Sequence, residues 1–349
     1  MKTGRSIREV LVELARQQSA KKDYISPAAS LSMRPDGRIL DMGERNFTAT
    51  DLFHRQVGAA LSIPAKYYDT MKREKPALLA ENVNAWLSDK EQSYMIRAME
   101  YPEEKPVARA FLSDRYRRID NMEVAEAVLP LFAGQAGLEI CSTEVTESKL
   151  YIKVVNHRLE MACVGDVVQA GVVISNSEVG LGAVSVQPLV YTLACSNGLV
   201  VSSMGERRTH IGRASRAEED FTIYSDETLA ADDRAYLLKL KDATLAAIDE
   251  VCFAQIVDTL AKTAEARING RVQDVVELTG KTYSLTTPEQ DDVLKYLIQG
   301  GDLSLYGLTN AITRASQDSP SYDRASAMES IGWQVAMMPA SQWKEINKT

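Results

Sequence analysis

A run of strand-like segments in the middle of the chain constrains the fold more than any other feature. Between about Ser93 and Ser202, short stretches rich in Val, Ile, Tyr and Thr are separated by Gly, Asn, Asp or Pro, as strands joined by turns are. Only residues 121–133 interrupt this pattern as a helix. Many strands with short links favour a largely antiparallel sheet over a βαβ series. Strands are expected in SYMIRAM, PVARAFLS, GLEICSTEV, KLYIKVV, VVQAGVVISNS, GAVSVQPLVYTLAC and GLVVSS.

Helices are expected before the strand-rich region. Residues 5–18 carry an apolar stripe, and Thr50 can cap a helix because its hydroxyl can accept a free N–H of the first turn. Pro64 and Pro76 suit the first positions of two further helices. Between these elements, the Pro/Asp/Gly turn at residues 34–37 predicts a hairpin.

The chain becomes helical again after Thr222. Leu245, Ile248, Cys252, Ile256 and Leu260 recur at spacings of three and four, which predicts one long amphipathic helix. The sequence therefore predicts an α+β fold: a largely antiparallel sheet with flanking helices and a helical C-terminal third. We expect a sheet-centred body at residues 1–221 and a helical region at 222–349, which can pack together as one domain.

The composition is that of a cytoplasmic globular protein. Of the 349 residues, 45% are hydrophobic and 25% are charged, which is ordinary for a soluble fold. No apolar run approaches the roughly 18 residues that span a bilayer, and the N-terminal segment has no apolar signal core. The four cysteines are scattered without a CxxC pair, as expected for reduced thiols. We expect no membrane partner.

The first of two arginine blocks, VARAFLSDRYRRIDN, covers residues 107–121. In a strand, Arg115 and Arg117 would share one face, and Tyr116 and Arg118 would share the other. Arginine pairs on one face suit phosphate or carboxylate recognition, and a tyrosine beside them can stack on a base. The alternative is a solvated strand end in which the arginines pair with neighbouring aspartates.

The second block, CSNGLVVSSMGERRTHIGRASR, covers residues 195–216. It carries Arg207, Arg208, His210, Arg213 and Arg216, with Glu206 as its only acid. Cations this close repel one another unless an anion or an acidic surface lies nearby. The block suits contact with a phosphate backbone. Alternatively, it bridges to the acidic segment that follows, in the same chain or in a neighbouring subunit.

The negative charge of the chain is concentrated in that following segment. Residues 217–265 hold twelve acids and four bases, which accounts for the whole net charge of −8 and leaves the rest of the chain neutral. A basic loop directly before a strongly acidic segment favours head-to-tail pairing between subunits. We therefore expect a homo-oligomer.

No catalytic or metal-binding signature stands out along the chain. The histidines, His54, His157 and His210, are far apart, and no His/Cys/Asp group has zinc-like spacing. Hydrolytic metal sites need ligands brought together with an open coordination position. We expect no enzyme activity, no cofactor and no metal site.

The order of several motifs is similar to that of one family. IPAKYYDTM, PALLAENVNAWL, VARAFLSDRYRRIDN, ISNSEVGLGAVSVQPLVYTLACSNGLVV, RRTHIGR and LSLYGLTNAITRASQD follow one another between residues 63 and 317. This order resembles the phage- and plasmid-encoded family catalogued as domain of unknown function nine-three-two. The resemblance implies a gene of a phage, prophage or conjugative element. It implies no activity and no catalytic residues.

These observations support two hypotheses of function. The first is a non-catalytic protein that binds single-stranded nucleic acid, DNA or RNA, and acts as an oligomeric annealing or recombination factor. The second is an anti-defence or regulatory protein that binds a host protein, with the acidic segment 217–265 mimicking nucleic acid.

Overall fold

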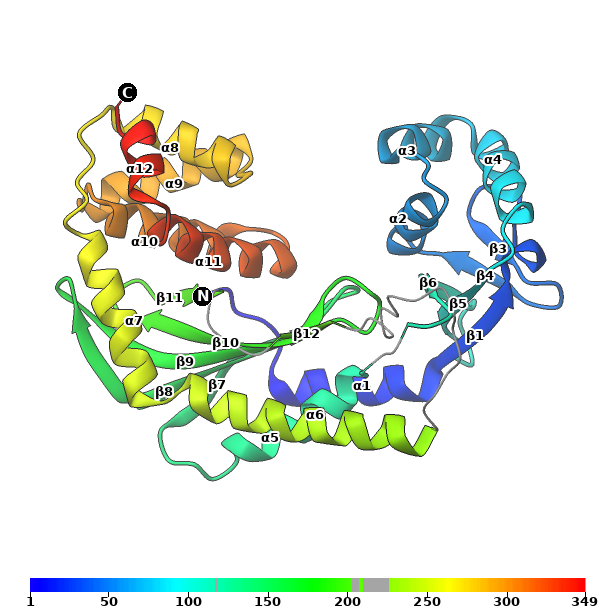
Figure 1. The fold of residues 1–349 in the computed structure, drawn as a ribbon, viewed down its shortest axis with the longest axis horizontal. Helices are drawn as coiled ribbons and strands as arrows, with labels where there is room; N and C mark the ends of the chain where they lie inside the picture. Colours follow the sequence, from blue (N-terminus) through cyan, green and yellow to red (C-terminus); the bar gives the residue numbers. More distant parts are fainter. Residues whose placement is uncertain (117–118, 203–206, 210–225, 349) are drawn as a thin grey trace.

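Two β-sheets and the helices packed on them make up the molecule (Figure 1). The computed structural model describes residues 1–116, 119–202, 207–209 and 226–348. The strands are β1 (Lys21–Pro27), β2 (Ser32–Met33), β3 (Ile39–Asp41), β4 (Asn46–Ala49), β5 (Ser93–Met99), β6 (Val107–Ser113), β7 (Leu138–Val145), β8 (Leu150–Cys163), β9 (Asp166–Asn176), β10 (Ala183–Thr192), β11 (Asn197–Val200) and β12 (Arg207–Thr209). The α-helices are α1 (Ile7–Ala20), α2 (Asp51–Ala60), α3 (Ala65–Glu74), α4 (Pro76–Ser88), α5 (Asn121–Phe132), α6 (Asp226–Ala247), α7 (Glu250–Thr263), α8 (Val272–Thr282), α9 (Thr287–Gly300), α10 (Leu305–Ala315), α11 (Tyr322–Ala336) and α12 (Ala340–Ile346), with short 3₁₀ turns at Ala28–Ser30 and Ser316–Asp318.

The first sheet has the strand order β1-β5-β6-β4-β3-β2 and is mixed. β4 and β6 run parallel, whereas the other neighbours are antiparallel. The predicted hairpin at residues 34–37 is confirmed as β2 and β3, and Gly37 takes the positive φ of 64° in its turn. Helices α2, α3 and α4 share an apolar core with this sheet. Thr50 caps α2 as predicted, because its hydroxyl accepts the N–H of Phe53 at 3.1 Å.

The second sheet is antiparallel throughout, in the order β11-β10-β9-β8-β7, with β12 paired to β10. Helices α1, α5 and α6 cover the face of this sheet to which Ile152 and Val154 of β8 contribute. The alternate residues Tyr151 and Lys153 point to the opposite face, where they meet Tyr322 and Glu329 of α11. Helices therefore cover both faces of the second sheet.

The C-terminal third is helical, as the sequence predicts, but the long helix expected across residues 245–260 is interrupted. α6 ends at Ala247, and Asp249 begins α7 by accepting the N–H of Val251 at 2.9 Å. Leu245 is consequently 42% exposed, whereas Ile256 and Leu260 are buried against the second sheet. An apolar spacing of three and four can continue across a break that a capping aspartate introduces.

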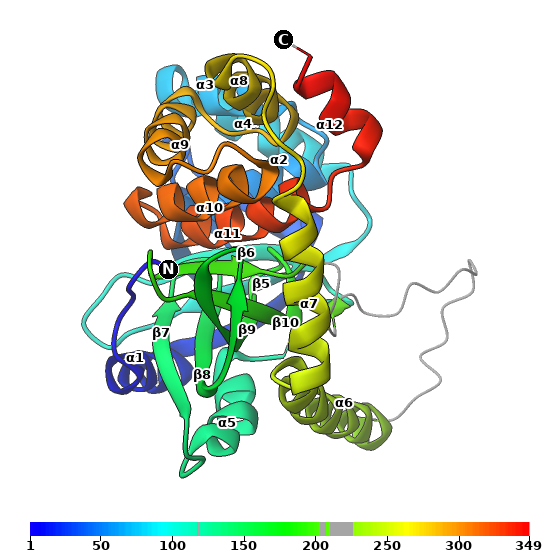
Figure 2. The ribbon, with the colours of Figure 1, turned by 90° about the vertical axis from the view of Figure 1, so that its left-hand side faces the viewer.

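The helices α8 to α12 and the helices α2 to α4 form two groups on the same side of the second sheet, at opposite ends of the molecule (Figure 1). Figure 2, turned by 90°, shows α1, α5 and α6 on the other side of the sheet. The architecture is α+β, with one mixed and one antiparallel sheet and a helical C-terminal region. Within the described residues, no helix is long and apolar enough to cross a membrane.

Candidate nucleic-acid interface

The first arginine block covers strand β6 and the turn that follows it. The strand stops at Ser113, and residues 114–116 form a turn in which the N–H of Tyr116 donates to the Ser113 carbonyl at 2.9 Å. The predicted strand alternation is therefore wrong for Arg115 and Tyr116, because the backbone has already left the sheet. Arg115 is exposed, and its N–H donates to the Ser113 hydroxyl at 3.2 Å. Arg117 and Arg118 lie outside the described residues.

Tyr116 anchors this turn to the second sheet. Its hydroxyl donates to the carbonyl of Ser177 at 3.2 Å, and its ring packs against a small apolar cluster that includes Leu52 and Val179. Burial raises the pKa of the phenol well above its usual value, so the hydroxyl stays protonated and remains a donor. The end of the first block is thereby held beside residues 177–179.

The arginines of the second block begin in strand β12. Arg207 pairs with Ser185 and Arg208 pairs with Val184, both on β10. The positions of His210, Arg213 and Arg216 lie outside the described residues, as do the side chains of Arg207 and Arg208. The backbone of β12 nevertheless places Arg207 and Arg208 beside the start of β10.

Both arginine blocks therefore adjoin the connection between β9 and β10, at one end of the second sheet. The connection between β9 and β10, residues 177–182, contacts the first block at Ser177 and leads directly into Ala183, which pairs with Thr209 of β12. Figure 1 shows β12 in the middle of the molecule and β6 to its right, below α2. Residues far apart in the sequence are brought together by the β9–β10 hairpin.

A cluster of six buried or nearly buried charged residues joins the two sheets next to the β9–β10 connection. We call it the junction cluster. The Glu178 carboxylate forms ion pairs with the Lys21 ammonium group, 2.9 Å from Oε2, and with the Arg109 guanidinium group, 3.0 Å from Oε1. Arg97 is fully buried and donates to the Glu178 carbonyl at 2.9 Å. The members of the cluster are Lys21, Asp23, Arg97, Arg109, Asp120 and Glu178.

The charges of the junction cluster balance, with three cations and three carboxylates. Burial alone would raise the pKa of Glu178, but Lys21, Arg109 and Arg97 outweigh it and lower that pKa to about 2. The carboxylate is therefore ionised under all ordinary conditions. Sequence reasoning missed this cluster, because its members come from β1, β5, β6 and the starts of two later segments. The one local signal of a buried charge was the position of Arg97 inside the apolar run of SYMIRAM.

A hollow of about 360 Å³ opens beside the junction cluster. Arg5, Arg16 and Arg109 line it, and Arg16 lies over the ring of Tyr101, 4.0 Å from its centroid. Each of the three arginines also contacts a carboxylate, of Glu144, Glu13 and Glu178 respectively. We call this feature the arginine hollow, which the sequence did not reveal.

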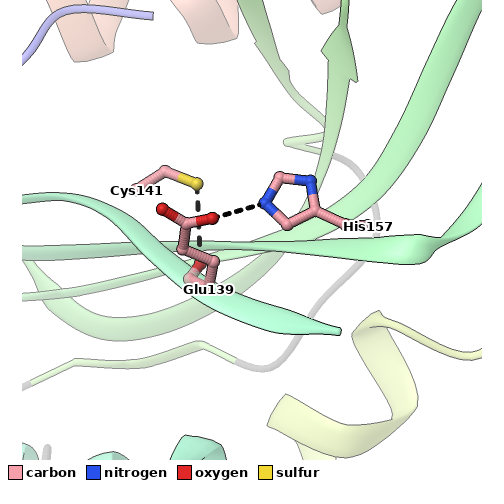
Figure 3. Close-up of side chains that lie close together, drawn as sticks. All are labelled: Glu139, Cys141 and His157. Atoms are coloured by element: carbon pink, nitrogen blue, oxygen red, sulfur yellow. Dashed lines mark hydrogen bonds and ion pairs between the residues drawn. The ribbon is translucent and has the colours of Figure 1, made fainter. Parts of the chain in front are cut away.

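Two of the three histidines, His54 and His157, lie within the described residues. His54 is buried, its Nδ1 lies 3.0 Å from the Tyr68 hydroxyl, and burial with the nearby Lys72 charge lowers its pKa to about 4. His157 lies beside Glu139 and Cys141, a group with metal-binding atoms that the sequence did not reveal (Figure 3). The search for zinc-like spacing along the chain misses this group, because strand pairing brings its members together.

These features define an α+β protein in which two sheets meet at a buried ionic cluster, with an arginine-rich end above it. The chain belongs to the family described as Domain of unknown function (DUF932), which matches residues 108–291. That range begins within β6 and ends in α9, so it contains the second sheet, both arginine blocks and the acidic segment. No curated protein and no solved structure matches the chain.

Proposed function

We propose that this protein binds single-stranded nucleic acid without catalysis, as an oligomeric annealing or recombination factor of a phage, prophage or plasmid, acting in the cytoplasm. The observation that supports the proposal is that both arginine blocks adjoin the β9–β10 connection, the first at Ser177 and the second through the pairing of β12 with the start of β10. Guanidinium groups from both blocks can then contact successive phosphates of one strand.

The arginine hollow favours a single strand over a duplex. At about 360 Å³ it is at the small end of ligand-binding cavities and has room for one unstacked base. A single strand can present such a base at little cost, whereas a duplex must unpair and unstack it, which costs a few kcal/mol. Tyr101 at the wall of the hollow offers a ring on which a base can stack if Arg16 moves to a phosphate.

The test is a salt series of binding to a labelled oligothymidine and to a duplex of equal length. Arg117→Ala and Arg208→Ala should each weaken binding to the single strand without preference for base sequence. Each lost phosphate contact should lower the log–log salt slope by roughly 0.7. Arg271→Ala is the matched control, because this side chain is 76% exposed beside α8, in the C-terminal group of helices.

The stability of the variants separates binding from folding. Loss of an exposed arginine usually changes stability by about half a kcal/mol, so the melting temperatures should stay near that of the parent. If both variants unfold, the arginines are internal ion-pair partners. If the variants stay folded and bind as the parent does, or if the parent does not bind, the proposal is wrong.

A second candidate function rests on the surface of α6 and α7. Exposed acids alternate there with exposed apolar side chains: Leu238 is 61% exposed and Val251 is 65% exposed. An acidic surface with apolar contacts suits a basic host protein, for which it would mimic nucleic acid. Under this alternative, Asp242→Asn would weaken inhibition of the target's DNA binding, whereas Arg208→Ala would leave it unchanged.

A further inference from the structure

Three side chains with metal-binding atoms lie together at the edge of the second sheet (Figure 3). Glu139 and Cys141 come from β7, the edge strand, and His157 comes from β8. The Glu139 Oε2 atom lies 2.8 Å from the His157 Nε2 atom, and the ligand atoms of all three residues lie within 4.8 Å of one another. Glu139 and His157 are exposed and Cys141 is half-buried, so an ion can reach the group from solvent.

A β-bulge sets the position of Cys141. The register between β7 and β8 passes from Ile140–Val154 directly to Ser142–Lys153, which leaves Cys141 as the extra residue. Bulges redirect side chains and are frequent beside functional sites. Cys141 accordingly packs beside Val155, which lies on the same face of β8 as His157.

Two further residues fix the orientation of the His157 ring. The Gln169 amide donates from Nε2 to the Glu160 carboxylate at 2.5 Å, which turns its carbonyl oxygen towards His157. That oxygen lies 2.9 Å from the His157 Nδ1 atom and can only accept a hydrogen bond, so Nδ1 carries a proton. Gln169 is itself 3% exposed and is held in place by the sheet.

The His157 Nε2 atom therefore faces the Glu139 carboxylate as the second ring nitrogen. If the ring is neutral, Nε2 is an acceptor, and two acceptors at 2.8 Å repel each other unless a cation lies between them. The cation is either a second proton on the ring or a metal ion. The Cys141 thiol donates to the Glu139 carbonyl oxygen at 3.6 Å, so its sulfur lies beside this pair and offers a third ligand to a metal ion.

We propose that Glu139, Cys141 and His157 bind a divalent transition metal of the Zn²⁺ class. Imidazole, thiolate and carboxylate are the ligands that zinc accepts, at about 2.0–2.3 Å from the ion. Closing the three ligand atoms onto such an ion requires side-chain movements of about 1 Å. The hydrogen bond from Nδ1 to Gln169 is the outer contact that metal-binding histidines generally make. A water molecule completes the fourth position on the exposed side.

The experiment is titration of the metal-free, full-length protein with Zn²⁺ and with Co²⁺. We expect one ion per chain and, with Co²⁺, a near-ultraviolet sulfur-to-metal charge-transfer band. His157→Gln and Cys141→Ser should each weaken Zn²⁺ binding by more than about 100-fold, and Gln169→Ala by about 10- to 100-fold. Cys195→Ser is the matched control, because it removes an exposed thiol elsewhere and should change nothing.

The outcomes are distinct. Because His157 and Glu139 are exposed, His157→Gln and Glu139→Gln should keep the circular dichroism spectrum and melting temperature of the parent. Absence of one-to-one Zn²⁺ binding by the parent, a Co²⁺ complex without the sulfur band, or full affinity in His157→Gln would overturn the proposal. A direct hydrogen bond between the His157 ring and the Glu139 carboxylate would then explain their contact. None of these outcomes depends on nucleic-acid binding.

Discussion

The buried pair of Lys153 and Glu329 should respond very differently to single and double substitution. Both side chains are fully buried, and the Lys153 Nζ atom lies 2.5 Å from the Glu329 Oε2 atom. Within the described residues, the other oxygen, Oε1, has no hydrogen-bond partner. Removing one member leaves an uncompensated charge in the core, which typically costs about 3–5 kcal/mol. That is a large part of the free energy of unfolding of a typical protein, which is roughly 5–15 kcal/mol.

Lys153→Met and Glu329→Leu should therefore each lower the free energy of unfolding by about 3–5 kcal/mol, whereas the double variant should lie close to the parent. Apolar replacements of similar volume remove both desolvation costs at once. Urea unfolding followed by tryptophan fluorescence suits the measurement, because Trp333 lies on the same helix as Glu329 and is 4% exposed. The double-mutant cycle gives the coupling energy directly. If Lys153→Met costs less than about 1 kcal/mol, or if the double variant loses the sum of the single losses, the reasoning fails.

Three further predictions follow from the junction cluster, from α10 and from the charge pattern. The pKa of Glu178 is lowered from 4.5 to about 2, so the ionised carboxylate contributes about 3 kcal/mol of stability above pH 4.5. This contribution is lost as the pH falls towards 2. Glu178→Gln should therefore make stability less dependent on pH over that range, and an unchanged pH profile would contradict this. Gly307→Ala should lower the melting temperature strongly, since a Cβ would lie 1.8 Å from the Asp302 carbonyl oxygen, whereas Gly300→Ala, which meets nothing within 4 Å, should not; equal effects would refute the steric argument. In mass photometry at low salt the protein should self-associate, because a basic loop precedes a segment of charge −8; a monomer at micromolar concentration, with or without nucleic acid, would exclude this.

The strands and most helices could be predicted because their signals are local. The cap at Thr50 and the prolines at the starts of α3 and α4 act within one turn of helix, and the Val, Ile, Tyr and Thr content of the strands is readable within each segment. The break at Asp249 was missed because apolar periodicity persists across it, and only the capping aspartate marked it. The parallel pairing of β4 with β6 depends on partners almost 60 residues apart, which periodicity cannot identify.

The candidate sites were less predictable, because they depend on contacts between elements. The arginine blocks were visible as composition, but their contacts with Ser177 and with the start of β10 depend on how β9 and β10 pair and fold. The group of Glu139, Cys141 and His157 could have been found by folding β7 and β8 into a hairpin, since Leu138 pairs with Asn156. The junction cluster had no comparable signal, because strand propensity says nothing about which charge a buried arginine will meet.

Helix α11 is synthesised after the sheet that it covers, which has a consequence for folding. Ribosomes make the second sheet well before residues 322–336, so the sheet face that α11 covers remains in water while the chain is still growing. While that face is in water, a hydrated Lys153 places a positive charge on it, which would oppose association of nascent chains through this face. When α11 packs on the sheet, its orientation about the helix axis is restricted, because the Lys153 ammonium group can leave water only if Glu329 faces it. The same charge thus protects the unfinished sheet and selects the correct closure.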